Sequence, residues 1–243
     1  MLRDYLWPAS VLLLAGFVKG VIGLGLPAVG VGLLGLSMPP VRAAAILVVP
    51  GSLTNVWQLF TGPNLARVFK RLWPLQVGIV IGCTLGAGTI SGPNTQTIRV
   101  ILGAVLACYA VYGLIARRLR VKPQWEVWMG PLVGLCTGLV TAATGLSLLP
   151  LAPYLAGLDE MERDDMVQSL GMSFTVSTIV FGFDLFRRGF FGDDLLIVSV
   201  VALIPAAIGM QIGTWVRYRI SPVLFRRCFF AAMLALGIEL IRG

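Results

Sequence analysis

Long apolar segments constrain the fold of this chain more than any other feature of its sequence. Each is about 20 residues or longer, enough for a helix to cross a hydrocarbon core of about 30 Å. There are eight of them, at residues 9–36, 41–60, 74–91, 97–116, 127–157, 165–183, 194–215 and 223–241. We therefore predict an all-α polytopic membrane protein.

Composition supports this class and excludes others. The chain is 57% hydrophobic and 12% charged, with a mean hydropathy of +0.89, which no soluble domain of this length requires. Strands of a membrane barrel alternate over about ten residues, so the long apolar runs fit helices better. The net charge of +8 comes from basic residues between apolar segments, where they orient membrane proteins, so it does not predict a nucleic-acid partner. We interpret the first apolar run as a retained span, because no small-residue cleavage site follows it.

The sequence contains few of the residue types that form catalytic or metal sites. It contains no histidine, which excludes histidine-ligated metal sites, Ser-His-Asp triads and histidine proton relays. The four cysteines are scattered singly through apolar segments, where cysteine packs as a small hydrophobe. We therefore expect no enzyme, no cofactor and no metal. The sequence has no ATP-binding motif either, so an ion or substrate gradient would supply energy for transport.

The chain repeats a glycine-rich pattern. Gly16 and Gly20 in the first apolar segment recur as Gly134 and Gly138 in the fifth, and GCTLG at 82–86 recurs as GMQIG at 209–213. We predict two repeats of four segments, residues 1–120 and 121–243, that together form one transmembrane transport domain. Duplicated halves with interrupted segments at matching positions are typical of secondary transporters.

The first and fifth segments are expected to be broken or re-entrant. Pro27 lies inside the first, and Pro150 and Pro153 lie near the end of the fifth. Proline removes a backbone donor and clashes with the preceding turn, which disfavours an uninterrupted helix. Two topologies stay open: eight full crossings, or inverted repeats that each cross three times. The distribution of lysine and arginine between the loops does not choose between them.

The paired glycines have two interpretations. Close helix packing explains glycines four residues apart in a membrane helix, and we favour it for 82–86 and 209–213. The pairs in the first and fifth segments are accompanied by further glycine, threonine and proline, which packing alone does not require. There we favour contact with a substrate.

Lys19 is the most informative single residue. It lies near the middle of the first apolar segment, where a lysine costs about 3 kcal/mol unless it faces a cavity or a partner. Gly20, Gly23 and Gly25 beside it would let a substrate approach the backbone, and a broken helix would present free N–H groups. We predict an anion site here. The alternatives are a lysine that snorkels to the interface, or one that pairs structurally with Asp184 or Glu239.

The second half supplies hydroxyl groups instead of charge. Thr137 aligns with Lys19, and Thr141, Thr144, Gly145 and Ser147 follow along the broken segment. Polar residues in the segments after each break can contact a substrate or form interhelical hydrogen bonds. The predicted substrate-binding residues are Lys19, Gly20, Gly23, Gly25, Asn55, Thr137, Thr141, Thr144, Gly145, Ser147 and Thr175. Arg42, at the start of the second segment, is interpreted as a snorkelling interface cation.

The two openings, GFVKGVIGLGLP and GLCTGLVTAATGLSLLP, together with four apolar segments per half, resemble the TauE/SafE family of sulfite exporter-like or toluene sulfonate uptake permeases. The resemblance covers essentially the whole chain. It implies a multi-pass protein of the bacterial inner membrane that moves sulfite, sulfoacetate, other organosulfonates or thiosulfate. Gly25-Leu26-Pro27 stands where the family often has a glycine triplet.

We therefore predict a secondary transporter of small sulfur-containing anions that works by alternating access in the lipid bilayer. The alternative is an anion channel on the same scaffold, because pores and transporters share polar-lined broken helices. A coupling ion, H⁺ or Na⁺, and assembly into a homo-oligomer stay open. Asp184 and Glu239 are the candidates for proton coupling, and both lie near segment ends.

Overall fold

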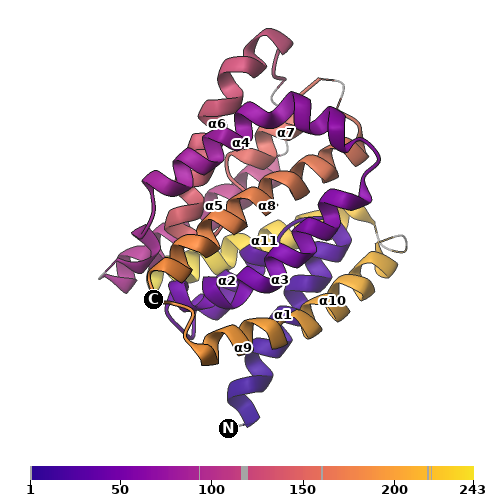
Figure 1. The fold of residues 1–243 in the computed structure, drawn as a ribbon. Coiled ribbons are helices and arrows are strands. Elements are labelled where there is room, and N and C mark those ends of the chain that lie inside the picture. The colour runs from indigo at the N-terminus through magenta and orange to yellow at the C-terminus, as the bar shows by residue number, and fades with distance from the viewer. Residues whose placement is uncertain (1, 93, 116–119, 160, 218, 220) are drawn as a thin grey trace. The chain divides into compact units, whose positions relative to one another are not determined.

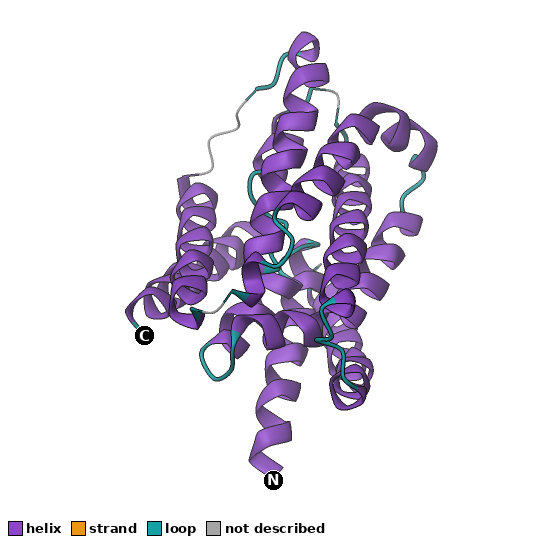
Figure 2. Ribbon diagram, turned by 60° about the vertical axis from the view of Figure 1, so that its left-hand side comes forward, coloured by secondary structure: helices purple, strands orange, loops and turns teal. Residues whose placement is uncertain are grey.

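The computed structural model describes residues 2–92, 94–115, 120–159, 161–217, 219 and 221–243, and these residues form helices and loops without a strand (Figure 2). The predicted all-α class is confirmed. The helices of the first half are α1 (Leu2–Ile22), α2 (Leu26–Gly35), α3 (Pro40–Thr61), α4 (Leu65–Leu85), the 3₁₀ turn η1 (Thr89–Ser91) and α5 (Thr95–Ile115). Those of the second half are α6 (Pro123–Thr144), α7 (Leu151–Gly157), α8 (Arg163–Arg187), α9 (Asp193–Val201), α10 (Leu203–Val216) and α11 (Pro222–Arg242) (Figure 1).

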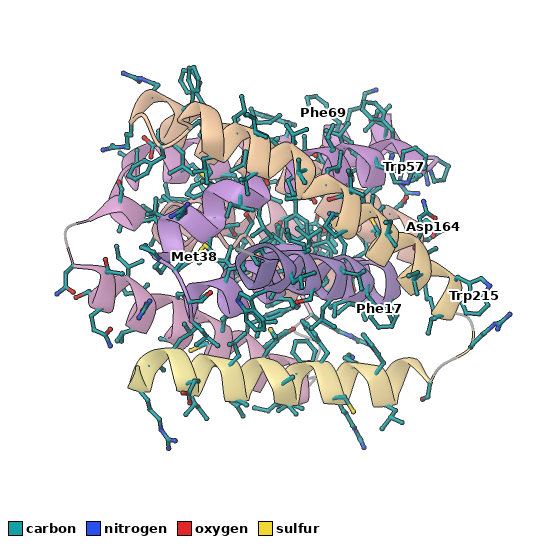
Figure 3. The ribbon with its side chains drawn as sticks, turned by 90° about the horizontal axis from the view of Figure 1, so that it is seen from below. Phe17, Met38, Trp57, Phe69, Asp164 and Trp215 are labelled. Carbon is teal, nitrogen blue, oxygen red and sulfur yellow. The ribbon has the colours of Figure 1, made fainter. Side chains whose placement is uncertain are left out.

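Six helical stretches within the described residues are long and apolar enough to cross a membrane. Many large apolar side chains are also exposed, among them Trp57 at 64%, Phe69 at 58% and Trp215 at 59%, which Figure 3 labels. Exposed apolar surface of this extent marks contact with lipid rather than water. The prediction of a multi-pass membrane protein is confirmed.

Both segments that were predicted to be broken are interrupted. The first divides into α1 and α2 around positive-φ glycines, and Pro27 occupies the first turn of α2. The fifth divides into α6 and α7, with Pro150 as the residue that precedes α7. Proline fits the first turn of a helix because the N–H groups there have no intrahelical acceptor.

One segment begins earlier than the sequence predicted. α4 starts at Leu65, although its apolar segment was expected to start at residue 74. The first turns carry Arg67, Lys70 and Arg71, which are among the basic residues between the apolar segments, but the neighbouring Val68 and Leu72 are buried. A helix that projects past the apolar core can be amphipathic, so charge alone does not mark its end.

The chain divides into two compact units. Unit 1 contains Met1–Pro50, Ile90–Ala116 and Gly189–Gly243, and unit 2 contains Gly51–Thr89 and Arg117–Arg188. Each unit therefore takes helices from both halves of the sequence. In unit 1, α1 packs on α10 and α5 on α11, whereas in unit 2, α4 packs on α6 and α8.

Glycines bring α1 and α10 together in unit 1. A Cβ atom on Gly16 would collide with the carbonyl oxygen of Ala206, and one on Gly20 with that of Met210. From the other side, Gly209 and Gly213 leave room for the backbone of α1 in the same way. The helices can approach this closely only because all four positions lack side chains.

The α4 and α6 pair of unit 2 repeats these contacts. Gly134 and Gly138 face the carbonyl oxygens of Leu75 and Ile79, and Gly78 and Gly82 face α6 in return. The packing interpretation of 82–86 and 209–213 holds, but the register differs from the one that sequence alignment indicated. By their contacts, Gly209 and Gly213 correspond to Gly78 and Gly82, one turn earlier in α4. Duplication of the complete halves stays a prediction.

Unit 1 also contains a proline in the middle of α3. Pro50 has no N–H group, so it cannot donate to the carbonyl oxygen of Ile46 one turn earlier. The buried Ser199 hydroxyl of α9 donates to that oxygen at 2.9 Å. This polar side chain therefore completes the backbone hydrogen bonding of a neighbouring helix.

Candidate functional site

The first helix break lies in unit 1 and begins at Gly23, one turn after Lys19. The N–H of Gly23 donates to the carbonyl oxygen of Lys19 at 2.7 Å, which ends α1. Gly23 and Gly25 have φ angles of 80° and 105°, a left-handed region that favours glycine, and α2 starts at the next residue. The break is therefore encoded by the two glycines and by Pro27.

Lys19 is buried, with 4% of its surface exposed, and it lies in the last turn of α1. A lysine that snorkels must expose its ammonium group, so burial argues against that alternative. The negative end of the helix dipole favours a cation at this position. Asp184, one proposed partner, forms its ion pair with Arg188 at 2.8 Å in unit 2, and Glu239 is exposed.

The three glycines beside Lys19 have different surroundings. The space beside Gly20 is filled by the backbone of α10, so packing explains its lack of a side chain. A Cβ atom on Gly25 would lie within 3.2 Å of Val18 and 3.3 Å of Phe229, so little space is left there. Gly23 alone of the three has open space where a side chain would be. Neighbouring side chains therefore leave the backbone uncovered at this position of the break.

The second break, in unit 2, is surrounded by hydroxyl groups. The N–H of Gly145, with a φ of 72°, donates to the carbonyl oxygen of Thr141 at 2.7 Å, as Gly23 does to Lys19. Thr141 Oγ1 lies 3.0 Å from Ser147 Oγ, which lies 2.8 Å from Ser177 Oγ of α8. The three hydroxyls form one buried chain from α6 across the break to α8.

Two further threonines of α6 differ in their hydrogen bonding. Thr144 Oγ1 donates to the carbonyl oxygen of Val140 and accepts from the N–H of Leu146 at 3.1 Å, so it holds the shape of the break. Thr137 is fully buried, and its hydroxyl oxygen has no hydrogen-bond partner among the described residues. A polar atom left this way inside a protein is costly unless it serves a ligand or water.

The remaining predicted residues, Asn55 and Thr175, make structural hydrogen bonds in unit 2. Asn55 Nδ2 donates to Thr178 Oγ1 at 3.3 Å and so links α3 to α8. Thr175 Oγ1 donates to the carbonyl oxygen of Gly171 in its own helix. The interhelical alternative thus describes the Asn55 contact, and their predicted contact with a substrate stays a prediction.

Sequence reasoning missed Gln76 and Ser177. Gln76 is buried in α4, donates through Nε2 to Ser173 Oγ at 3.0 Å, and leaves its Oε1 atom without a partner among the described residues. Ser173 and Ser177 lie one turn apart on α8, so Gln76 adjoins the hydroxyl chain at the second break. A glutamine within an apolar segment was the available signal, but its partner on α8 is nearly 100 residues away in the sequence.

The predicted set therefore falls into two groups. Lys19, Gly20, Gly23 and Gly25 gather at the break of unit 1, and the hydroxyl residues with Gly145 gather at the break of unit 2. Relative to the packing glycines, the second break comes later: Gly23 follows Gly20 by three residues and Gly145 follows Gly138 by seven. The four extra residues make about one helical turn. Lys19 thus corresponds to Thr137 by packing and to Thr141 by distance from the break.

Comparison with known proteins identifies the family of the chain. The family model described as "Sulfite exporter TauE/SafE" matches residues 9–240, nearly the whole chain. The chain belongs to the TauE/SafE family. Members of this family are membrane transporters of the sulfite exporter type rather than enzymes. No curated protein and no solved structure matches the chain.

Proposed function

We propose that this TauE/SafE protein is a secondary transporter of small sulfur-containing anions, such as sulfite, sulfoacetate, other organosulfonates or thiosulfate, in the bacterial inner membrane. The observation that carries the proposal is a buried lysine beside an open helix break in a chain that matches a sulfite exporter family. The anion is moved by alternating access.

Electrostatics favours an anion at the first break. A lysine ammonium group donates charge-assisted hydrogen bonds to anionic oxygens, and these are stronger than hydrogen bonds between neutral groups. Gly23 leaves open space four residues after Lys19, where α1 has ended. α2 begins three residues after Gly23, and the free N–H groups at its N-terminal end also favour negative charge.

The set of hydroxyl side chains at the second break is the proposed neutral counterpart of Lys19. Thr137, Thr141, Thr144 and Ser147 carry O–H groups that can donate to sulfonate or sulfite oxygens. Hydrogen bonds of Thr141, Thr144 and Ser147 to each other or to the backbone keep these three residues ordered in the absence of an anion. Thr137, whose hydroxyl is without a described partner, is the member best placed to gain a bond when an anion binds.

The test is uptake of labelled sulfite, sulfoacetate and thiosulfate by proteoliposomes. Wild-type protein is expected to give saturable flux, and Lys19→Met to lower it about tenfold or more, because charged hydrogen bonds contribute about 1.5–3 kcal/mol. Lys70→Met is the matched control, since Lys70 is exposed on α4. Equal flux in wild type and Lys19→Met would remove Lys19 from the mechanism.

The same vesicles distinguish the transporter from an anion channel. A transporter gives slow, saturable flux that responds to an imposed H⁺ or Na⁺ gradient, whereas a channel gives single-channel currents and no coupling. Single-channel currents in planar bilayers would overturn the proposal of alternating access. Absence of any sulfur-anion flux, with protein that is folded by circular dichroism, would overturn the proposed function itself.

A further inference from the structure

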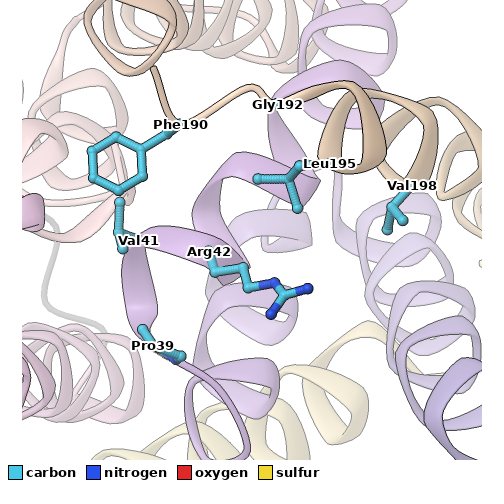
Figure 4. A pocket seen from close by; sticks show the side chains of 7 residues that line it. All are labelled: Pro39, Val41, Arg42, Phe190, Gly192, Leu195 and Val198. Atoms are coloured by element: carbon cyan, nitrogen blue, oxygen red, sulfur yellow. The ribbon is translucent and has the colours of Figure 1, made fainter. Parts of the chain in front are cut away.

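A pocket of about 590 Å³ lies in unit 1, away from the helix break. It is formed where α3 begins, where α9 begins, and by the connection that precedes α9 (Figure 4). The lining side chains that matter are Pro39, Val41, Arg42, Phe190, Leu195 and Val198. Arg42 is the charged residue among the lining residues, and the remainder are apolar apart from Gly192.

The pocket lies at the edge of the membrane-spanning part of the protein. The candidate span Pro40–Phe60 and the candidate span Leu195–Val216 both begin at it. The ends of spans lie at the level of lipid headgroups, because the hydrocarbon core matches the apolar length of the helix. Arg42 is therefore placed where phosphate groups of the bilayer occur.

The apolar side of the pocket continues along a helix surface suited to lipid chains. In the span Leu195–Val216, only 22% of the apolar stretch is buried inside the protein. This is the lowest share among the candidate spans of the described residues. Ile197 at 62% and Ile204 at 61% expose most of their side chains on this surface. An acyl chain that leaves the pocket past Leu195 and Val198 would meet apolar side chains.

We propose that this pocket binds one anionic glycerophospholipid, with the phosphate on the Arg42 guanidinium and an acyl chain against Leu195 and Val198. Arginine offers two parallel N–H groups that match phosphate oxygens. A zwitterionic choline headgroup adds a cation for which the described lining residues provide no acidic partner. The proposal does not depend on the transported anion, since the lipid is a component of the surrounding membrane.

Native mass spectrometry of the delipidated, detergent-solubilised full chain tests the proposal. Phosphatidylglycerol is expected to bind about tenfold more tightly than phosphatidylcholine, as one charged hydrogen-bonding group can provide. Arg42→Gln should abolish this preference, while Arg242→Gln, which changes an exposed arginine in the last turn of α11, should keep it. Val198→Phe, which fills the pocket and leaves Arg42 in place, should weaken binding of both lipids.

Three results would overturn the proposal. One is a wild-type protein that binds both lipids equally. Another is a phosphatidylglycerol preference that Arg42→Gln retains, together with lipid binding that Val198→Phe leaves unchanged. The third is displacement of phosphatidylglycerol by inorganic phosphate or sulfite, which would show that the pocket takes small free anions. None of these results bears on sulfite flux through proteoliposomes, so failure here is distinguishable from failure of the proposed function.

Discussion

The two helix breaks share a backbone plan but differ in chemistry. In each, a helix packed through paired glycines ends at a glycine with positive φ, and a short helix follows. The break of unit 1 contains a buried lysine, whereas that of unit 2 contains a chain of hydroxyl groups. Backbone geometry can thus be retained while the side-chain chemistry at the two breaks changes independently.

The largest expected effect tests what the breaks share. Gly20→Ala and Gly138→Ala each place a Cβ against the backbone of the partner helix, and each should destabilise the protein by about 3 kcal/mol. Thermal unfolding in detergent measures this. Gly51→Ala is the control, because its Cβ would make only ordinary contact with Thr178. Wild-type stability in either helix-pair variant would contradict the shared packing.

The next effect tests how the breaks differ. Lys19→Met removes a buried charge and keeps the length of the side chain, so flux should fall about tenfold while stability is kept. Ser147→Ala removes a neutral hydrogen-bonding group and should lower flux only about threefold. Flux and unfolding are measured on the same preparations. A loss of stability of about 3–5 kcal/mol in Lys19→Met would assign the lysine to a structural ion pair instead.

Backbone conformation gives a smaller effect that should again be equal in both breaks. Gly23→Ala and Gly145→Ala place a side chain at φ angles of 80° and 72°, which costs about 1–2 kcal/mol. Gly192→Ala serves as control, since that residue also has open space around it but a φ of −66°. If Gly23→Ala behaves like Gly192→Ala in thermal unfolding, the left-handed turn at the first break is wrong.

The smallest expected effect concerns the Thr144 hydroxyl, which holds the second break. Thr144→Val leaves the Leu146 N–H without its hydroxyl acceptor and should cost about 1 kcal/mol, while Thr144→Ser should be nearly neutral. Hydrogen exchange at Leu146 reports the change locally. Equal exchange in the valine and serine variants would show that the hydroxyl does not order the second break.

Local patterns were sufficient for much of the fold. The apolar runs predicted the membrane class, and glycine with proline predicted the two breaks, because both signals act within a few residues. The basic residues at the start of α4 misled the prediction, since Arg67 and Lys70 lie on the exposed side of a helix whose buried side includes Val68 and Leu72.

Long-range pairing limited the prediction of the candidate sites. Nothing near Gln76 in the sequence indicates that Ser173 faces it, and nothing near Ser147 indicates Ser177. Such contacts depend on how α8 packs against its neighbours. Lys19 was identified because a charge in an apolar segment is conspicuous alone, whereas a serine becomes informative only when its partners are known.

The origin of each glycine-packed helix pair has a consequence for how the protein is made. α1 packs on α10 and α4 packs on α6, so in both pairs one helix comes from each half of the chain. During synthesis, about 180 further residues are made after α1 before α10, its packing partner, begins. Residues 1–120 and 121–243, produced as separate polypeptides, should therefore be unstable alone and regain packing only when co-expressed.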